Sequence, residues 1–223
     1  MRDKAADAAR MAIKRNDFLE KGFELFSTKT IEAVSMQDVA DASGYGVATL
    51  YRYFTTKNVF VVEVATWKWD QFREENLKLR SEEEIDRLSA AQHFEHYLDS
   101  FLRLYTEHRD ILRFNQFFNM YVQSEDLDAA TLKPYREMIA RYEQLFHNIY
   151  LKAKKDKTIR TDVSEKEMFS TTLHLMLAAI TRYAVGLVYI PEEGFDTKKE
   201  LCTMKDMLLA RYQSEEPRSL KCG

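Results

Sequence analysis

Apolar positions recur at steps of three and four residues along almost the whole chain. This spacing places them on one face of an α-helix, because an α-helix turns once in about 3.6 residues. Alternation with period two, which is typical of half-buried strands, does not extend over a useful length. A first helix is marked by one apolar face and breaks at residues 28–30; the face comprises Phe18, Leu19, Gly22, Phe23, Leu25 and Phe26. The pattern therefore predicts an all-α fold.

Two short helices are predicted after this break. Ser35 has the residue type of a helix N-cap, and Asp38 three residues later nearly completes a capping box. Gly44 tolerates the left-handed backbone that ends a helix, so the first short helix stops at residues 43–44. A second short helix is expected over residues 47–53.

Longer helices are predicted over the rest of the chain. One covers residues 59–79, and Ser164 and Thr197 each stand three residues before a glutamate, a pattern that predicts helix starts at both positions. The helix after Ser164 is expected to end near Pro191, and the one after Thr197 near Tyr212. Three further apolar stripes lie between them: Phe94, Tyr97, Leu98, Phe101, Leu104 and Tyr105; Ile111, Phe114, Phe117, Phe118 and Tyr121; and Tyr135, Met138, Ile139, Tyr142, Leu145, Phe146 and Ile149.

Two short helices joined by a tight turn and held against an amphipathic helix form a helix-turn-helix. The second helix must be pinned by apolar residues on one side and present small or polar residues to the major groove on the other. The residues expected to act as pins are Val39, Ala40, Leu50 and Phe54. The residues expected to face outward are Val47, Ala48, Thr49, Arg52 and Tyr53.

The composition agrees with long helices, and the charge is compatible with DNA binding without requiring it. Six Gly and three Pro are few for 223 residues, whereas sheet proteins need many turns. Residues 1–58 carry nine Lys/Arg and eight Asp/Glu, a net charge of +1, in a chain whose net charge is −3. DNA binding would thus rest on a few well-placed cations.

No secretion signal or membrane span is predicted. The first sixteen residues carry charges throughout and have no apolar core. The most apolar stretch, residues 173–190, contains His174 and Arg182, so a buried helix is the better interpretation. The two cysteines, Cys202 and Cys222, form neither a metal-type spacing nor a disulfide framework. A cytoplasmic protein is expected.

Residues 15–62 resemble the N-terminal domain of the TetR family. The segments that carry the resemblance are residues 18–26 (FLEKGFELF), 38–45 (DVADASGY) and 49–60 (TLYRYFTTKNVF). Three positions depart from the family pattern. Phe23 stands where the family has the second alanine of the first helix, which predicts tighter or shifted packing. Lys29 stands where the family usually has glycine, and because a non-glycine residue in a left-handed conformation costs about 1 kcal/mol, the loop is expected to differ locally. Gly46 replaces the usual serine cap of the second short helix.

The resemblance implies a domain that binds double-stranded DNA over residues 1–58, here called the head. Ser35, Thr49, Tyr53 and Lys57 would contact phosphates, Lys57 with help from a helix N-terminus. Base reading would fall to Tyr45, Gly46, Val47, Ala48 and Arg52, and Arg52 could equally bind a phosphate. Tyr51 is expected to pack rather than to contact DNA. The basic residues before position 16 are expected to form a solvated helix start, with contacts to the DNA backbone or minor groove as the alternative.

The resemblance also implies a helical regulatory, ligand-binding and dimerisation domain over residues 59–214. Residues 215–223 are expected to form a disordered tail. The helix at about 164–190 is apolar nearly all round, and the helix at about 197–212 has more apolar surface than one contact needs, so both are expected to pair in a homodimer. A small apolar or aromatic effector is expected in the aromatic body, with no cofactor and no metal. Its candidate contacts are Phe101, Asn115, Gln116, Phe118, Asn119, Tyr142, Phe146, His174 and Arg182.

Two other classes of function can be compared with a DNA-binding regulator. An enzyme is not expected, because the short cluster around His93 and His96 lacks the recurring ligands of a metal site and no nucleophile or phosphate-loop motif occurs. A helical binding module or adaptor that has lost DNA recognition remains an alternative, because the head is nearly neutral. The resemblance favours a ligand-responsive repressor that binds a pseudo-palindromic operator as a homodimer.

Overall fold

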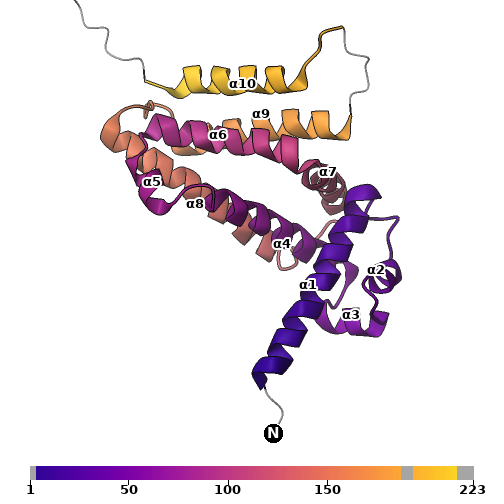
Figure 1. The fold of residues 1–223 in the computed structure, drawn as a ribbon. Helices are drawn as coiled ribbons and strands as arrows, with labels where there is room; N and C mark the ends of the chain where they lie inside the picture. Colours follow the sequence, from indigo (N-terminus) through magenta and orange to yellow (C-terminus); the bar gives the residue numbers. More distant parts are fainter. Residues whose placement is uncertain (1–3, 187–192, 215–223) are drawn as a thin grey trace, which may run out of the picture. The chain divides into compact units, whose positions relative to one another are not determined.

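The computed structural model describes residues 4–186 and 193–214, and over these residues it contains ten α-helices and a single isolated β-bridge (Figure 1). The all-α fold predicted from the apolar spacing is confirmed. None of the described helices is long and apolar enough to cross a membrane. The predicted helix end near Pro191 and the tail at 215–223 lie outside the described residues.

The chain divides into two compact units. The first takes in the described residues up to Glu75 together with Asp110–Ala140, and the second takes in Asn76–Arg109 and the described residues from Arg141 onward. The whole head falls within the first unit. The predicted division into a DNA-binding domain (1–58) and a regulatory domain (59–214) is a statement about function and stays a prediction.

The first unit contains α1 (Lys4–Thr28), α2 (Met36–Ala42), α3 (Val47–Tyr53), most of α4 (Lys57–Leu77), nearly all of α7 (Arg109–Ser124) and the start of α8 (Lys133–Asp156). A continuous series of aromatic rings forms its core. The Phe60 ring lies 4.9 Å from that of Phe54 and 5.9 Å from that of Phe26, and Phe114 lies 6.5 Å from Phe26 and 5.9 Å from Phe118, centroid to centroid. All five rings are buried. The series joins the helices of the head to α7.

The second unit contains α5 (Glu82–Arg87), α6 (Ala90–Glu107), the rest of α8, α9 (Glu165–Val185) and α10 (Thr197–Tyr212). Helices α6, α9 and α10 contact one another, and they lie side by side in Figure 1. Phe146 on α8 packs against three aromatic rings, with centroid distances of 6.0 Å to Phe94, 5.5 Å to Tyr97 and 5.5 Å to Phe169. A backbone hydrogen bond fixes the C-terminal end of α10, since the Arg160 N–H donates to the Tyr212 carbonyl over 2.9 Å.

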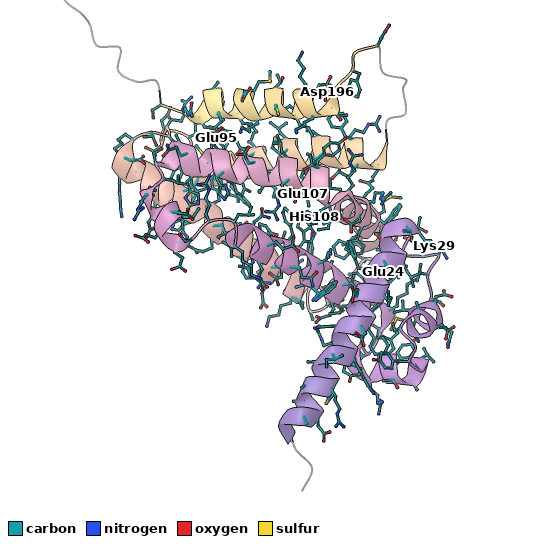
Figure 2. The ribbon with its side chains drawn as sticks, viewed as in Figure 1. Glu24, Lys29, Glu95, Glu107, His108 and Asp196 are labelled. Carbon is teal, nitrogen blue, oxygen red and sulfur yellow. The ribbon has the colours of Figure 1, made fainter. Side chains whose placement is uncertain are left out.

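Three details add to or differ from the sequence-based expectations. Lys29 is accommodated without a left-handed backbone: its N–H donates to the Leu25 carbonyl over 2.9 Å, so it continues the α1 hydrogen-bonding pattern, and Figure 2 shows it just beyond the end of that helix. The cap of α10 is Asp196 rather than Thr197, because the Asp196 carboxylate accepts from the backbone N–H groups of the second and third helical residues. The short helix α5, capped by Ser81, was not predicted.

Candidate nucleic-acid interface

The turn between α2 and α3 is built as the sequence predicts. The Ser35 hydroxyl accepts from the Asp38 N–H over 3.1 Å, and the Ser35 N–H donates to the Asp38 carboxylate over 2.8 Å, which completes the capping box. Gly44 has a φ of 72°, and the Tyr45 N–H turns back to the Ala40 carbonyl over 3.1 Å. A side chain at Gly44 would be strained at this φ, so the turn depends on glycine there.

The second short helix, α3, is pinned on one side and exposed on the other. All four predicted pins are at most 1% exposed: Val39, Ala40, Leu50 and Phe54. Ala48 and Arg52 are exposed, as predicted, and an Arg52 guanidinium N–H donates to the Thr49 hydroxyl over 3.3 Å. The N-cap of α3 is Gly46, which supplies no side-chain hydrogen bond. The exposed face of α3 is therefore available to contact a partner.

Tyr51 lies on this exposed face. The packing role expected for it is wrong, because its side chain is 46% exposed. Positions 48, 51 and 52 share one side of α3, and all three are exposed. The helical spacing of these positions can be read from the sequence. It was not applied to Tyr51, because an aromatic side chain is usually expected in the core.

Two of the candidate DNA contacts are anchored by α1. The Tyr45 hydroxyl donates to Asp17 over 2.7 Å, and this hydrogen bond raises the pKa of Tyr45. The Tyr45 and Tyr53 rings lie 5.2 Å and 5.8 Å from the Phe18 ring, centroid to centroid. The hydroxyl proton of Tyr45 is thus already engaged, which leaves its oxygen lone pair and ring edge for any base contact. Val47 and Thr49 are half-buried at the start of α3.

Ser35 is also engaged within the head. Its hydroxyl donates to the Asp38 carboxylate over 2.7 Å while it accepts from the backbone. These bonds lower the pKa of Asp38 and stabilise its negative charge. A phosphate contact by Ser35 would have to draw the hydroxyl away from Asp38, so this candidate is weaker than Lys57 on geometry.

Lys57 is the first residue of α4, and its ammonium group has two neutral neighbours. The Nζ atom lies 3.5 Å from the Glu32 carbonyl oxygen and 5.8 Å from the centroid of the Tyr121 ring. Burial lowers the pKa of Lys57, and the carboxylates of Glu32 and Glu125 oppose this shift. The helix start itself is capped, because the Thr56 hydroxyl accepts from the Val59 N–H over 3.2 Å. A cation at a helix N-terminus suits a phosphate.

The nine candidate effector contacts are distributed over both units. Asn115, Gln116, Phe118 and Asn119 lie on α7 in the first unit, and the other five lie in the second. Phe101, Asn115, Phe118 and Phe146 are buried, Gln116 and Tyr142 are half-buried, and Asn119, His174 and Arg182 are exposed. Their role in effector binding stays a prediction.

Buried hydroxyls on α9 were not predicted. Thr172 is fully buried and Thr181 is 9% exposed, and neither hydroxyl oxygen has a hydrogen-bond partner among the described residues. Leaving a buried polar atom unsatisfied costs about 1–3 kcal/mol, so such atoms call for an explanation. The sequence pattern does not single out these threonines, because their burial depends on the tertiary packing of α9.

The histidine cluster on α6 does not form a metal site. Over the described ranges 4–186 and 193–214, no group of three or more His, Cys, Asp and Glu side chains could hold a metal ion. Burial lowers the pKa of His93 to about 4, with a further contribution from Lys152. His93 is therefore a neutral, packed side chain at physiological pH.

Comparison with known proteins gives a family match for part of the N-terminal region and a fold match for nearly the whole chain. Residues 18–64 match the family model for bacterial regulatory proteins of the tetR family. A search of the curated proteins finds no match. Among solved structures, a putative transcriptional regulator from Saccharomonospora viridis in complex with choline is 16% identical with a TM-score of 0.70, and the alignment covers 92% of this chain and all of that one.

Two further solved structures have the same fold. A TetR family transcription regulator from Marinobacter aquaeolei is 18% identical, with a TM-score of 0.64, over 93% of this chain and all of that one. The regulator FadR from Bacillus subtilis, in complex with stearoyl-CoA, is 13% identical, with a TM-score of 0.67, over 87% of this chain and 97% of that one. These likenesses extend over both units. Residues 18–64 thus match the tetR family of bacterial regulatory proteins, and the chain shares the fold of these solved regulators over nearly its whole length.

Proposed function

We propose that this chain is a ligand-responsive repressor that binds a pseudo-palindromic operator as a homodimer in the cytoplasm. The observation that carries the proposal is the exposed face of α3, held on a head whose four pins are all buried. A helix of this size with small and polar outward residues fits the major groove of duplex DNA. The repressor mode is taken from the common behaviour of the family.

Arg52 and Lys57 have different roles in this proposal. Arg52 projects from the exposed side of α3, where a guanidinium can form two hydrogen bonds with a guanine edge. Lys57 lies at the start of the next helix and would pair with a phosphate, which fixes position without reading sequence. Ala48 would contact a thymine methyl, and Tyr51 lies beside it on the same face.

The homodimer is proposed to form through α9 and α10. Both helices expose large apolar side chains, with Leu175 49%, Val185 43% and Met207 67% exposed. On α9 the exposed residues follow a helical spacing through His174, Ala178 and Arg182, so they form one face. Covering such a face with its symmetry mate would remove the apolar area from water, and dimers with two-fold symmetry use the same face twice.

The effector is proposed to be a small molecule with an apolar part. The aromatic core around Phe146 and the unpartnered hydroxyls of Thr172 and Thr181 would offer apolar contact and polar anchors in the second unit. Two of the structural neighbours were solved with choline and with stearoyl-CoA. An effector would act by binding one conformation of the dimer more tightly than the other.

The test is a mobility-shift titration of the purified protein with its own upstream intergenic DNA, at low and moderate salt. Lys57→Ala should weaken binding to every sequence and reduce the slope of log K against log salt by about 0.9 for each phosphate that is no longer bound. Arg52→Ala should also reduce the preference for the operator over unrelated DNA. Lys78→Ala removes the same charge from an exposed position beyond the end of α4 and should bind as wild type.

The alternative function is a helical binding module that no longer recognises DNA, and it is favoured by the net charge of only +1 on the head. A stable dimer that shows no preference for the upstream DNA at low salt would support that alternative. A steep salt dependence with operator preference would exclude it.

A further inference from the structure

Tyr121 on α7 interacts with the start of α4 through both its hydroxyl group and its aromatic ring. Its hydroxyl donates to the Asn58 side-chain oxygen over 2.5 Å, and the face of its ring lies 5.8 Å from the Lys57 Nζ atom. The side chain is only 2% exposed. Burial and the carboxylates of Glu125 and Glu32 raise the pKa of Tyr121 to about 12, so the hydroxyl keeps its proton and remains a donor at physiological pH.

The surroundings of Lys57 orient its charge without neutralising it. The Nζ atom lies 3.5 Å from the Glu32 carbonyl oxygen and 5.8 Å from the centroid of the Tyr121 ring, and both groups are neutral. The carboxylates of Glu32, Glu125 and Asp38 act on the ammonium only through longer-range electrostatics. A directly paired carboxylate would have to be displaced before a phosphate could bind. A carbonyl and a ring face instead hold the side chain in one region and leave most of its charge available.

We propose that Tyr121 is a positioning residue for DNA binding: it holds the first turn of α4 through Asn58 and the ammonium group through its ring, so that Lys57 is already placed for a phosphate. This inference rests on the proposed function. Tyr121 lies outside the segment that matches the family model, residues 18–64, and comes from a helix of the regulatory part of the chain. Preorganisation of this kind increases affinity because less side-chain freedom is lost on binding.

The positioning role differs from a purely structural one in a measurable way. A residue that acts through Lys57 has no effect on affinity once Lys57 is gone, whereas a residue that only supports the fold lowers affinity in either background. Two substitutions separate the two contacts of Tyr121. Tyr121→Phe removes the hydrogen bond to Asn58 and keeps the ring, and Tyr121→Leu removes both.

The experiment measures the dissociation constant of the full-length protein for upstream intergenic DNA in the wild-type and Lys57→Ala backgrounds. Tyr121→Phe should raise the dissociation constant about three- to tenfold, the change expected when one hydrogen bond is removed, and Tyr121→Leu should raise it further. Both effects should be equal on operator and unrelated DNA, since a phosphate contact reads no sequence. In the Lys57→Ala background neither substitution should change affinity by more than about twofold.

Tyr135→Phe is the matched control. Tyr135 is also in the first unit, its ring packs 4.8 Å from that of Phe118, and it has no part in the Lys57 contacts, so its variant should bind DNA as wild type does. Wild-type affinity in Tyr121→Phe and Tyr121→Leu, or an equal reduction in both backgrounds, overturns the positioning role and leaves the proposed function intact. Failure of the wild-type protein to bind this DNA overturns both.

Discussion

Gly22 on α1 packs closely against α4, and this close approach yields a quantitative prediction. A Cβ atom added there would lie 2.5 Å from Cζ and 2.8 Å from Cε1 of Phe60, and 3.2 Å from Cγ2 of Val64. Carbon atoms in contact prefer separations of about 3.5–4.0 Å, so the Phe60 ring would have to move by about 1 Å. That ring is fully buried and flanked by the rings of Phe26 and Phe54, which leaves it little room.

Two opposing effects decide the outcome of Gly22→Ala. Alanine in a helix interior is favoured over glycine by about 1 kcal/mol. Overpacking a filled core costs about 1–3 kcal/mol. The cost is expected to win, so Gly22→Ala should lower the free energy of unfolding of the first unit by about 1 kcal/mol.

The assay is urea unfolding followed by tryptophan fluorescence. Both tryptophans, Trp67 and Trp69, lie on α4, so the signal reports on the first unit. Asn16→Ala, at an exposed position of α1, measures the gain in helix propensity without the clash and should stabilise by roughly half a kcal/mol. In a Phe60→Leu background, where the ring is gone, Gly22→Ala should become stabilising. Stabilisation of the wild-type protein by Gly22→Ala would refute the packing argument.

Two further predictions concern the second unit. The pKa of His93 is about 4 in the folded protein against 6.5 for an unperturbed histidine, so the unfolded state binds the proton more readily; the associated stability is present above about pH 6.5 and is lost as the pH falls toward 4. After a discount for partial exposure, His93 should make the free energy of unfolding about 1 kcal/mol lower at about pH 5 than at about pH 7, as measured by urea unfolding. This difference between the two pH values should be smaller in His93→Gln. An unchanged difference in that variant would contradict the assignment. Met207→Glu or Leu175→Glu should weaken the dimer at least about tenfold by light scattering, because a charge would be buried in an apolar contact. Leu151→Glu, at a 41% exposed leucine of α8, is the control, and dimers of normal affinity in both α9 and α10 variants would exclude this interface.

Local features of the head could be predicted because each depends on residues close in sequence. The capping box at Ser35, the turn at Gly44 and the burial of Leu50 follow from spacing and backbone chemistry alone. The Asp196 cap was missed although it is equally local, since Thr197 one position later offered a competing pattern. The departure at Lys29 changes the loop only locally, because Lys29 continues the α1 hydrogen bonds and needs no left-handed backbone.

Features that depend on distant segments could not be predicted. The contacts of Tyr121 with Lys57 and Asn58 join positions more than sixty residues apart, and the sequence shows only that each residue is of a suitable type. The same holds for the buried hydroxyls of α9, because whether a threonine faces the core depends on how the neighbouring helices pack. Most residues of the aromatic stripes are buried, as predicted, but the stripes do not show which rings meet.

The aromatic series of the first unit bears on how regulators of this kind can be recombined. The rings of Phe23 and Phe26, on α1, lie 5.5 Å and 6.5 Å from that of Phe114 on α7, so the core of the DNA-reading part is completed by a segment that returns from much later in the chain. A chimera that fused residues 1–58 to the body of another regulator would leave these rings against a foreign helix. The portable module is therefore discontinuous: a successful graft would carry α7 with the head, and substitutions on that helix would be inherited together with DNA preference.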